Sequence, residues 1–133
     1  MATPEGVRAA LENICATLRA QKVEEDAVGS VQMVVAEALN NIVEHALKDV
    51  AEGTIHLAMT RSDRSISFVI RDAGSPMPGH QLPPGDLPAI GSDVDAYPEG
   101  GFGWYLIRTL TSDLRYDRAR GENTLSFQLA LCR

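Results

Sequence analysis

The feature that most restricts the fold of this sequence is a change of hydrophobic period after Gly53. Before Gly53, apolar residues recur at intervals of three and four, and after it they alternate with polar residues. The first pattern places apolar side chains along one face of a helix, and the second places them on one face of a strand. The chain is therefore expected to begin with amphipathic helices and to continue with strands that have one covered and one wet face.

Two helices are expected before Gly53. The first covers roughly the first twenty residues, with an apolar stripe of Val7, Leu11, Ile14 and Leu18. The second begins near Glu24, since negative charge is favoured at the start of a helix. Its apolar stripe consists of Val28, Val31, Val35, Leu39, Ile42 and Ala46. Glu37, Asn41 and His45 form a polar ridge on a different face of this helix. His45 is expected to pack at the end of the helix.

Four strands and a third helix are expected after Gly53. Alternation predicts a hairpin of strands at 55–59 and 66–70, and a second pair at 114–116 and 125–131 joined by a turn at 120–123. A glycine loop and a helix that ends at about Thr111 separate the two pairs. Helices over the apolar face of a mostly antiparallel, mixed sheet give a two-layer α/β (α+β) sandwich. With 133 residues, the chain is expected to form a single domain spanning 1–133.

Composition excludes several classes of function. The net charge of −6 argues against direct nucleic-acid binding, because phosphate backbones attract basic surfaces. No apolar run approaches the length needed to span a membrane, and no signal peptide is recognisable. Cys15 and Cys132 lie within patterned elements, which favours free thiols in a cytoplasmic protein over a disulfide.

Periodicity disappears between residues 75 and 99, where prolines and glycines are frequent. A loop of this length in a compact domain is usually functional or disordered, and we favour an active-site lid because glycine motifs flank both ends. At its far end, Gly100 to Gly103 precede a helix whose free N–H groups and dipole suit phosphate. The alternative for these glycines is a plain connecting turn.

Two polar positions suggest further ligand chemistry. Asn41 can offer an amide oxygen to Mg²⁺, with Glu37 one turn away as a general base. Asp72 ends a strand, where its carboxylate can accept a hydrogen bond from an exocyclic amine such as that of adenine. Gly74 would allow the base to lie against the backbone. The plainer alternatives are a solvated helix face and a turn aspartate.

Three segments together resemble the nucleotide-binding boxes of the GHKL ATPase/kinase superfamily. They are residues 35–46 (VAEALNNIVEHA), 72–74 (DAG) and 100–107 (GGFGWYLI). The short format is most similar to bacterial anti-sigma-factor serine/threonine kinases of the RsbW type. Two features depart from the family pattern. Pro76 stands where a glycine is expected, and the sequence begins with a helix where relatives often have a strand that can pair protomers.

The resemblance implies a role for each matching residue. It makes Glu37 the catalytic base, Asn41 the Mg²⁺ ligand within the ATP site, and Asp72 the adenine ligand beside Gly74. The glycine segment would hold the phosphates through Gly101, Phe102 and Gly103, under the loop at 75–99. Thr124 resembles the last-strand threonine that supports the adenine site, although a plain surface threonine is an equal alternative.

The implied fold is the Bergerat (GHKL) ATP-binding fold, and the implied function is that of an ATP- and Mg²⁺-dependent protein serine/threonine kinase. Its expected substrate is an STAS-type anti-anti-sigma protein, its alternative partner is a sigma factor, and a homodimer is left open. A second hypothesis is a non-catalytic switch that binds nucleotide or a partner. The third, a detached histidine kinase catalytic domain, is less favoured because the first helix lacks a histidine.

Overall fold

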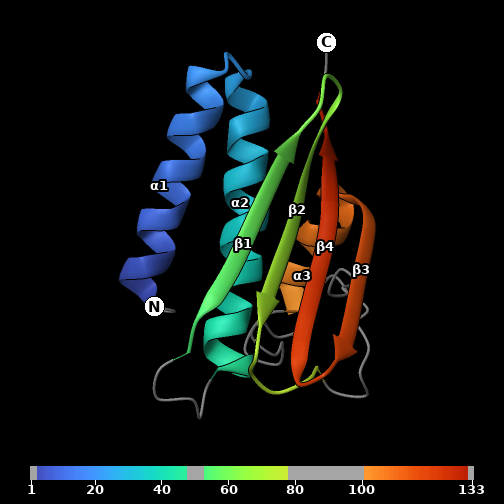
Figure 1. Ribbon diagram of the computed structural model, residues 1–133. Helices are drawn as coiled ribbons and strands as arrows, with labels where there is room; N and C mark the ends of the chain where they lie inside the picture. Colours follow the sequence, from blue (N-terminus) through green and yellow to red (C-terminus); the bar gives the residue numbers. More distant parts are fainter. Residues whose placement is uncertain (1–2, 48–52, 78–100, 132–133) are drawn as a thin grey trace, which may run out of the picture.

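A computed structural model of the chain describes residues 3–47, 53–77 and 101–131, with only the backbone for 101–103. Helices α1 (Pro4–Ala20) and α2 (Glu25–Asn41) come first, and a π-helical turn η1 (Ile42–Ala46) continues α2. Strands β1 (Ile55–Arg61) and β2 (Ser65–Asp72) precede α3 (Gly101–Leu110), which is followed by β3 (Ser112–Ala119) and β4 (Glu122–Ala130) (Figure 1). The element order is therefore the one that the periodicity predicts.

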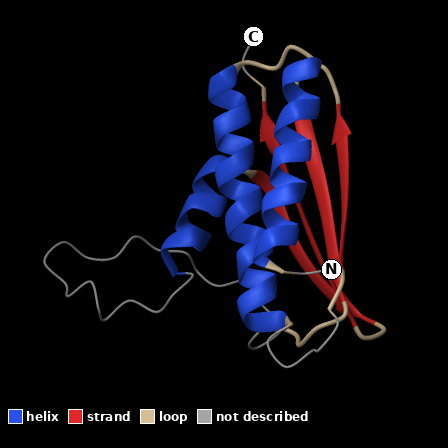
Figure 2. Cartoon of the chain, turned by 90° about the vertical axis from the view of Figure 1, so that its left-hand side faces the viewer, coloured by secondary structure: helices blue, strands red, loops and turns tan. Residues whose placement is uncertain are grey.

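The strands form one sheet with the order β1-β2-β4-β3, in which every pair is antiparallel. The three helices all lie on one face of this sheet (Figure 2). The predicted two-layer α+β sandwich is confirmed. The sheet was expected to be mixed, but the described strands are antiparallel throughout, including the central pair of β2 and β4.

The core lies between the helices and the two central strands. On β2 and β4, buried residues alternate with partly exposed ones, and Phe68 lies opposite Phe127 with ring centroids 5.5 Å apart. From the helices, fully buried side chains meet this surface: Leu18, Val28, Val31, Val35 and Ile107. The apolar stripes predicted for the first two helices thus face the sheet, and burial of these side chains is the main source of stability.

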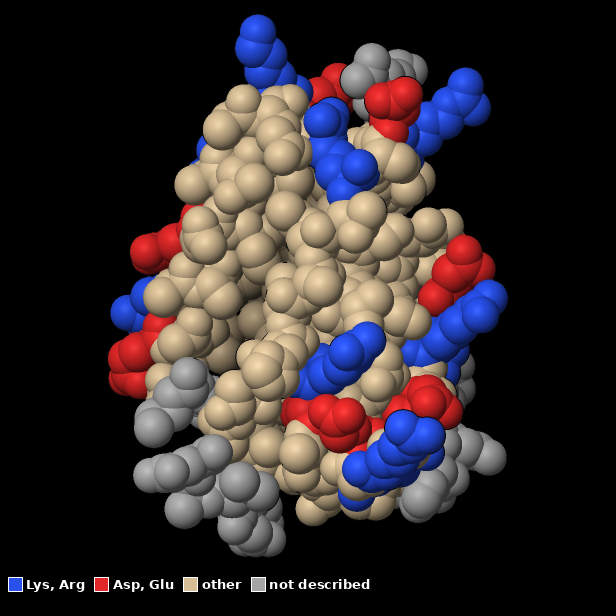
Figure 3. Space-filling model, in the orientation of Figure 1, with Lys and Arg blue, Asp and Glu red and all other residues tan. Residues whose placement is uncertain are grey.

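The opposite face of the sheet is open. Figure 3 shows that its centre is free of charged side chains, which lie towards the two ends of the strands and along the edges of the view. Most residues at these outward positions are small or polar, among them Ala58, Thr60, Ser67, Thr124 and Ser126. The alternation therefore separates a covered face from a wet one, as predicted.

Local sequence signals explain where the elements begin and end. The Thr3 side chain accepts a hydrogen bond from the Gly6 amide at 3.0 Å, which caps the start of α1. Between β3 and β4 the turn is only two residues long, and Arg120 and Gly121 both have positive φ angles, 54° and 78°.

Within the described ranges, no helix has the length and apolar character needed to cross a bilayer.

Candidate functional site

Asn41 is the last residue of α2, and its side chain is 9 % exposed. Its Nδ2 donates to the backbone carbonyl of Glu37 at 2.8 Å. A carbonyl only accepts hydrogen bonds, so this contact fixes which end of the amide is which. The Oδ1 atom makes no hydrogen bond to the described residues, and it is therefore available to a cation. The Glu37 side chain, one turn earlier, is half-buried.

The helix changes its hydrogen bonding immediately after Asn41. The residues of η1 form a π-helical turn, which ends where the Leu47 amide donates to the Ile42 carbonyl at 2.9 Å. Single π-helical turns are rare and are frequent at functional sites. His45, which was expected to pack here, is exposed instead. The apolar residue that packs at this end is Leu47, which is 6 % exposed.

Asp72 is the last residue of β2, and its side chain is only 3 % exposed. Its Oδ1 accepts two hydrogen bonds, from the Gly74 amide at 2.9 Å and from Nδ2 of Asn123 at 2.9 Å. Its Oδ2 makes no hydrogen bond to the described residues. The carboxylate is thus held on one oxygen and open on the other, which is the arrangement that an exocyclic amine would need.

Gly74 lies against the end of η1. A Cβ atom at this position would be 2.2 Å from the Ala46 carbonyl oxygen, well inside any normal contact distance. Beside it, the Ser75 amide donates to the same oxygen at 2.8 Å. The close approach of two backbone segments therefore explains why a glycine stands at 74. This contact brings the Asn41 and Asp72 segments together, although they are 31 positions apart in the sequence.

Asn123 is a site residue that the sequence interpretation missed. It lies opposite Asp72 in the β2–β4 register, is 5 % exposed, and contacts the Asp72 carboxylate directly. Thr124 pairs with Arg71 instead, at a position of the opposite parity, so its side chain lies on the open face of the sheet. A role for Thr124 in nucleotide binding stays a prediction, and Asn123 supplies the contact to Asp72 from the last strand.

Two β3 residues complete the polar cluster around Asn123. The Tyr116 hydroxyl donates to Oδ1 of Asn123 at 2.6 Å, and the Arg118 guanidinium donates to the same oxygen at 3.1 Å. Arg118 also donates to the Gly74 carbonyl at 2.6 Å. The sheet order explains this meeting, because β3 and β2 flank β4 on its two sides.

The glycine segment is described only in part. The glycines were expected in a loop before the helix, but Gly101 and Gly103 lie within the first turn of α3, which packs against α2. The Trp104 and Ile107 side chains are buried, which assigns Trp104 to the core. The phosphate contacts expected of the Gly101, Phe102 and Gly103 backbone stay a prediction, and the side chain of Phe102 lies outside the described part. Most of the predicted lid, residues 78–99, also lies outside it.

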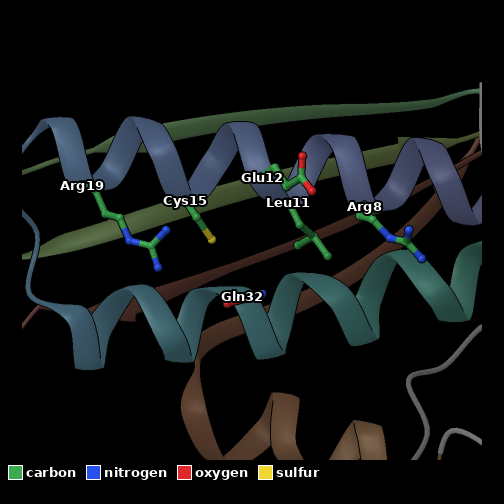
Figure 4. Close-up of a pocket in the computed structure, with 6 residues that line it drawn as sticks. All are labelled: Arg8, Leu11, Glu12, Cys15, Arg19 and Gln32. Carbon is green, nitrogen blue, oxygen red and sulfur yellow. The ribbon is translucent and has the colours of Figure 1, made fainter.

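A groove of about 290 Å³ lies elsewhere, between α1 and α2 (Figure 4). Its walls include no predicted site residue; they consist of Arg8, Leu11, Glu12, Cys15, Arg19 and Gln32. Cys15 is buried and free, which agrees with the expected thiol, while Cys132 lies outside the described residues. The groove and the polar cluster are therefore separate features.

The described residues include no group of three or more His, Cys, Asp or Glu side chains that could hold a metal by themselves. A single amide oxygen at Asn41 is nevertheless compatible with Mg²⁺. This ion commonly takes one or two protein oxygens and completes its octahedron with phosphates and water. The donor set therefore fits a cation that arrives with a nucleotide.

The fold agrees with a comparison to known families. Residues 1–129 match the family described as "Histidine kinase-like ATPase domain". The chain belongs to this family.

Curated relatives narrow the resemblance. The chain is 40 % identical over 91 residues to the serine/threonine-protein kinase BtrW of Bordetella bronchiseptica, covering 68 % of this chain and 61 % of BtrW. It is 32 % identical over 108 residues to the serine-protein kinase RsbW of Bacillus cereus (strain B4264), covering 75 % of this chain and 62 % of RsbW. The chain thus spans about three fifths of the length of these two relatives.

A solved structure supports the fold alone. The histidine kinase domain of the blue-light activated histidine kinase from Erythrobacter litoralis EL346 superposes with a TM-score of 0.56 at 16 % identity. The match covers 94 % of this chain and 61 % of that chain.

Proposed function

We propose that this chain is an ATP- and Mg²⁺-dependent serine/threonine kinase domain of a bacterial partner-switching pathway. Its substrate is an STAS-type anti-anti-sigma protein, and its alternative partner is a sigma factor. The names of the relatives support the kinase reaction, since BtrW is called a serine/threonine-protein kinase and RsbW a serine-protein kinase. The proposed setting is the cytoplasm. A homodimer is compatible with the proposal.

One observation carries the nucleotide assignment. Asn41 and Asp72 are both buried, and each keeps one oxygen outside the hydrogen bonding of the described residues. Among the described residues no buried side-chain nitrogen or oxygen lacks a partner, so these two open oxygens are accessible to a ligand from solvent. The Ser75–Ala46 backbone contact joins the two segments that carry these side chains. An adenine nucleotide with its metal offers the two complementary groups, an exocyclic amine for Asp72 and a cation for Asn41.

Different residues of this chain then bind the base, the metal and the phosphates and activate the substrate hydroxyl. The Asp72 carboxylate binds the exocyclic amine of the base, and Oδ1 of Asn41 provides a hard oxygen ligand for the metal. The N–H groups at the start of α3 provide donors suited to phosphate. Glu37 orients the substrate hydroxyl and accepts its proton. When bound, Mg·ATP supplies the phosphoryl group and the positive charge that stabilises its transfer.

The two alternatives remain distinguishable from this proposal. A non-catalytic switch would bind nucleotide or partner through the same polar cluster but transfer no phosphate. A detached histidine kinase domain would phosphorylate a histidine rather than a hydroxyl. The half-buried Glu37 beside Asn41 favours hydroxyl phosphorylation, because a hydroxyl nucleophile benefits from a general base.

Thermal unfolding and phosphotransfer together test the proposal. The midpoint of unfolding is measured with ATP, ADP and GTP, each with and without Mg²⁺, since a bound ligand raises stability by mass action. Purified STAS-domain proteins from the same genome are then incubated with the chain and γ-labelled ATP. We expect stabilisation by Mg·ATP and acid-stable labelling of serine or threonine. Stabilisation without labelling would support the switch, and the absence of both would refute the proposal.

A further inference from the structure

Asn123 stands at the centre of a hydrogen-bond cluster in which its own amide is completely satisfied. Its Nδ2 donates to Oδ1 of Asp72 at 2.9 Å and to the Ser75 carbonyl at 2.8 Å. Its Oδ1 accepts from Tyr116 at 2.6 Å and from Arg118 at 3.1 Å. A primary amide has two donor hydrogens and two acceptor lone pairs, so every hydrogen-bonding position of Asn123 is in use.

The cluster has only one consistent direction of donation. The Met77 amide donates to the Tyr116 oxygen at 3.0 Å, so the Tyr116 hydroxyl hydrogen is directed towards Asn123. Arg118 can only donate. Two donors therefore face one end of the Asn123 amide, which places its NH₂ group towards Asp72. The orientation of this amide is thus determined by its partners on β3.

This direction fixes the carboxylate of Asp72. Its Oδ1 receives N–H groups from Asn123 and Gly74 on two sides, and this holds the carboxylate plane in one orientation. The remaining oxygen, Oδ2, is then presented at one place and can only accept while the group is ionised. A ligand atom that faces Oδ2 must carry a hydrogen to donate, since a ligand carbonyl oxygen would place two acceptors against each other.

We propose that Asn123, oriented by Tyr116 and Arg118, is a positioning residue that sets the preference of this site for 6-amino over 6-oxo purines. The inference rests on the proposed nucleotide function. Asn123 acts through Asp72, which makes the contact with the base. Without the Asn123 amide, the carboxylate can rotate and a water molecule can enter the space. A bridging water can donate to a 6-oxo group, so discrimination between the two bases falls.

The test compares ATP with inosine triphosphate, which carries oxygen in place of the amine at position 6. Calorimetry with Mg²⁺ measures both dissociation constants for the wild type and for Asn123→Ala and Tyr116→Phe. We expect the ratio of the two constants to fall about tenfold in Asn123→Ala, because misplacement of a binding group by a fraction of an ångström is costly. A smaller fall is expected in Tyr116→Phe, which keeps the aromatic ring and loses the donor.

Matched controls come from exposed positions of the same residue types. Arg118→Met is compared with Arg115→Met, since Arg115 lies on β3 with an exposed side chain on the other face. Asn123→Ala is compared with Asn13→Ala on the exposed side of α1. We expect both control variants to keep the wild-type ratio. Unfolding without nucleotide verifies that each variant is folded.

Each outcome decides the inference. A lower ratio in folded Asn123→Ala, with the controls unchanged, supports it. Equal losses of affinity for both nucleotides would mean a purely structural role and would overturn it. If Asn123→Ala does not fold, the ratio in Tyr116→Phe decides in the same way. A wild type that binds neither nucleotide refutes the proposed function itself, whereas a wild type that prefers ATP with unchanged variant ratios refutes only the role of Asn123.

Discussion

The backbone amide of Ser75 lies 2.8 Å from the carbonyl oxygen of Ala46 and donates a hydrogen bond to it. This one contact joins the end of the helix that carries Asn41 to the loop that follows Asp72. It forms because Gly74 has no side chain to hold the two backbones apart. The relative position of Asn41 and Asp72, the two side chains proposed to bind the nucleotide and its metal, therefore depends on a close backbone approach rather than on a direct contact between them.

Replacing Gly74 with alanine should destabilise the fold and weaken nucleotide binding. The added Cβ would lie 2.2 Å from the Ala46 oxygen and 2.9 Å from a methyl group of Leu47, so the backbones must separate. Overpacking of this kind costs about 1–3 kcal/mol of unfolding free energy. Urea unfolding measures the loss, and calorimetry with Mg·ATP measures the binding.

Gly29→Ala is the matched control for this variant. A Cβ at Gly29, within α2, meets no atom within 4 Å. Alanine is favoured over glycine inside a helix by about 1 kcal/mol, so this variant should be at least as stable as the wild type. Equal stability of the two variants would contradict the steric explanation for Gly74.

Hydrophobic period predicted the elements and the covered face of the sheet, but it did not predict the π-helical turn after Asn41. The apolar stripe continues through Ile42 and Ala46, which is why a single helix was expected there. The spacing of apolar side chains does not distinguish the hydrogen bonds of an α-helix, which join residues four apart, from those of a π-helix, which join residues five apart. The turn is visible only in the Leu47–Ile42 hydrogen bond.

The face of the sheet on which Asn123 lies could have been predicted from parity alone. Leu125, Phe127 and Leu129 form the covered face of β4, so Asn123 belongs to the same face and Thr124 to the other. The turn was expected to extend through Asn123, which removed it from consideration. The actual turn ends at Gly121, because consecutive positive φ angles close it in two residues. Contacts across strands, such as Tyr116 to Asn123, require the sheet order as well.

Asn41→Ala should remove the Mg²⁺ dependence of nucleotide binding. The substitution deletes the open Oδ1 atom and leaves the helix itself in place, since alanine is a good helix former. Affinity for ATP with Mg²⁺ is expected to fall at least tenfold, because even the loss of a group that only orients a metal ligand costs about 10–100-fold. Affinity without Mg²⁺ should change little.

The neighbouring Asn40 provides the control for Asn41, because it lies on the same helix with an exposed side chain. Asn40→Ala should bind Mg·ATP as the wild type does. Calorimetry measures the affinity of both variants for ATP, with Mg²⁺ and with EDTA in place of Mg²⁺. If Asn41→Ala keeps the full Mg²⁺ dependence, the metal is held elsewhere.

A surface ion pair predicts a small acid dependence of stability. Arg19 hydrogen-bonds to Glu25 at 2.8 Å, and this contact lowers the pKa of the Glu25 carboxyl below its ordinary value. A lowered pKa in the folded state adds stability above the unfolded pKa, and this stability is lost as pH falls through the folded value. Both side chains are exposed, so solvent screens the pair and the effect is small.

Glu25→Gln should therefore flatten the acid limb of the stability profile, measured by urea unfolding between about pH 3 and 6. Glu12→Gln is the control, because Glu12 is exposed and forms no ion pair among the described residues. An identical acid limb in Glu25→Gln and the wild type would mean that the pair does not contribute in solution.

Glu37→Gln separates a kinase from a switch. Glutamine keeps the size of the side chain and its hydrogen-bonding ability but cannot accept a proton as a base. Loss of general-base assistance slows transfer about 10²–10⁴-fold. Affinity for ATP should stay near the wild-type value, because the backbone carbonyl that Asn41 contacts is unchanged. Rapid-quench measurement of labelled STAS protein tests the rate, with Glu44→Gln, an exposed carboxylate on η1, as the control.

Undiminished transfer in Glu37→Gln would exclude this carboxylate as the base. Binding without transfer in the wild type would identify the chain as a switch, because the nucleotide would then act through occupancy alone.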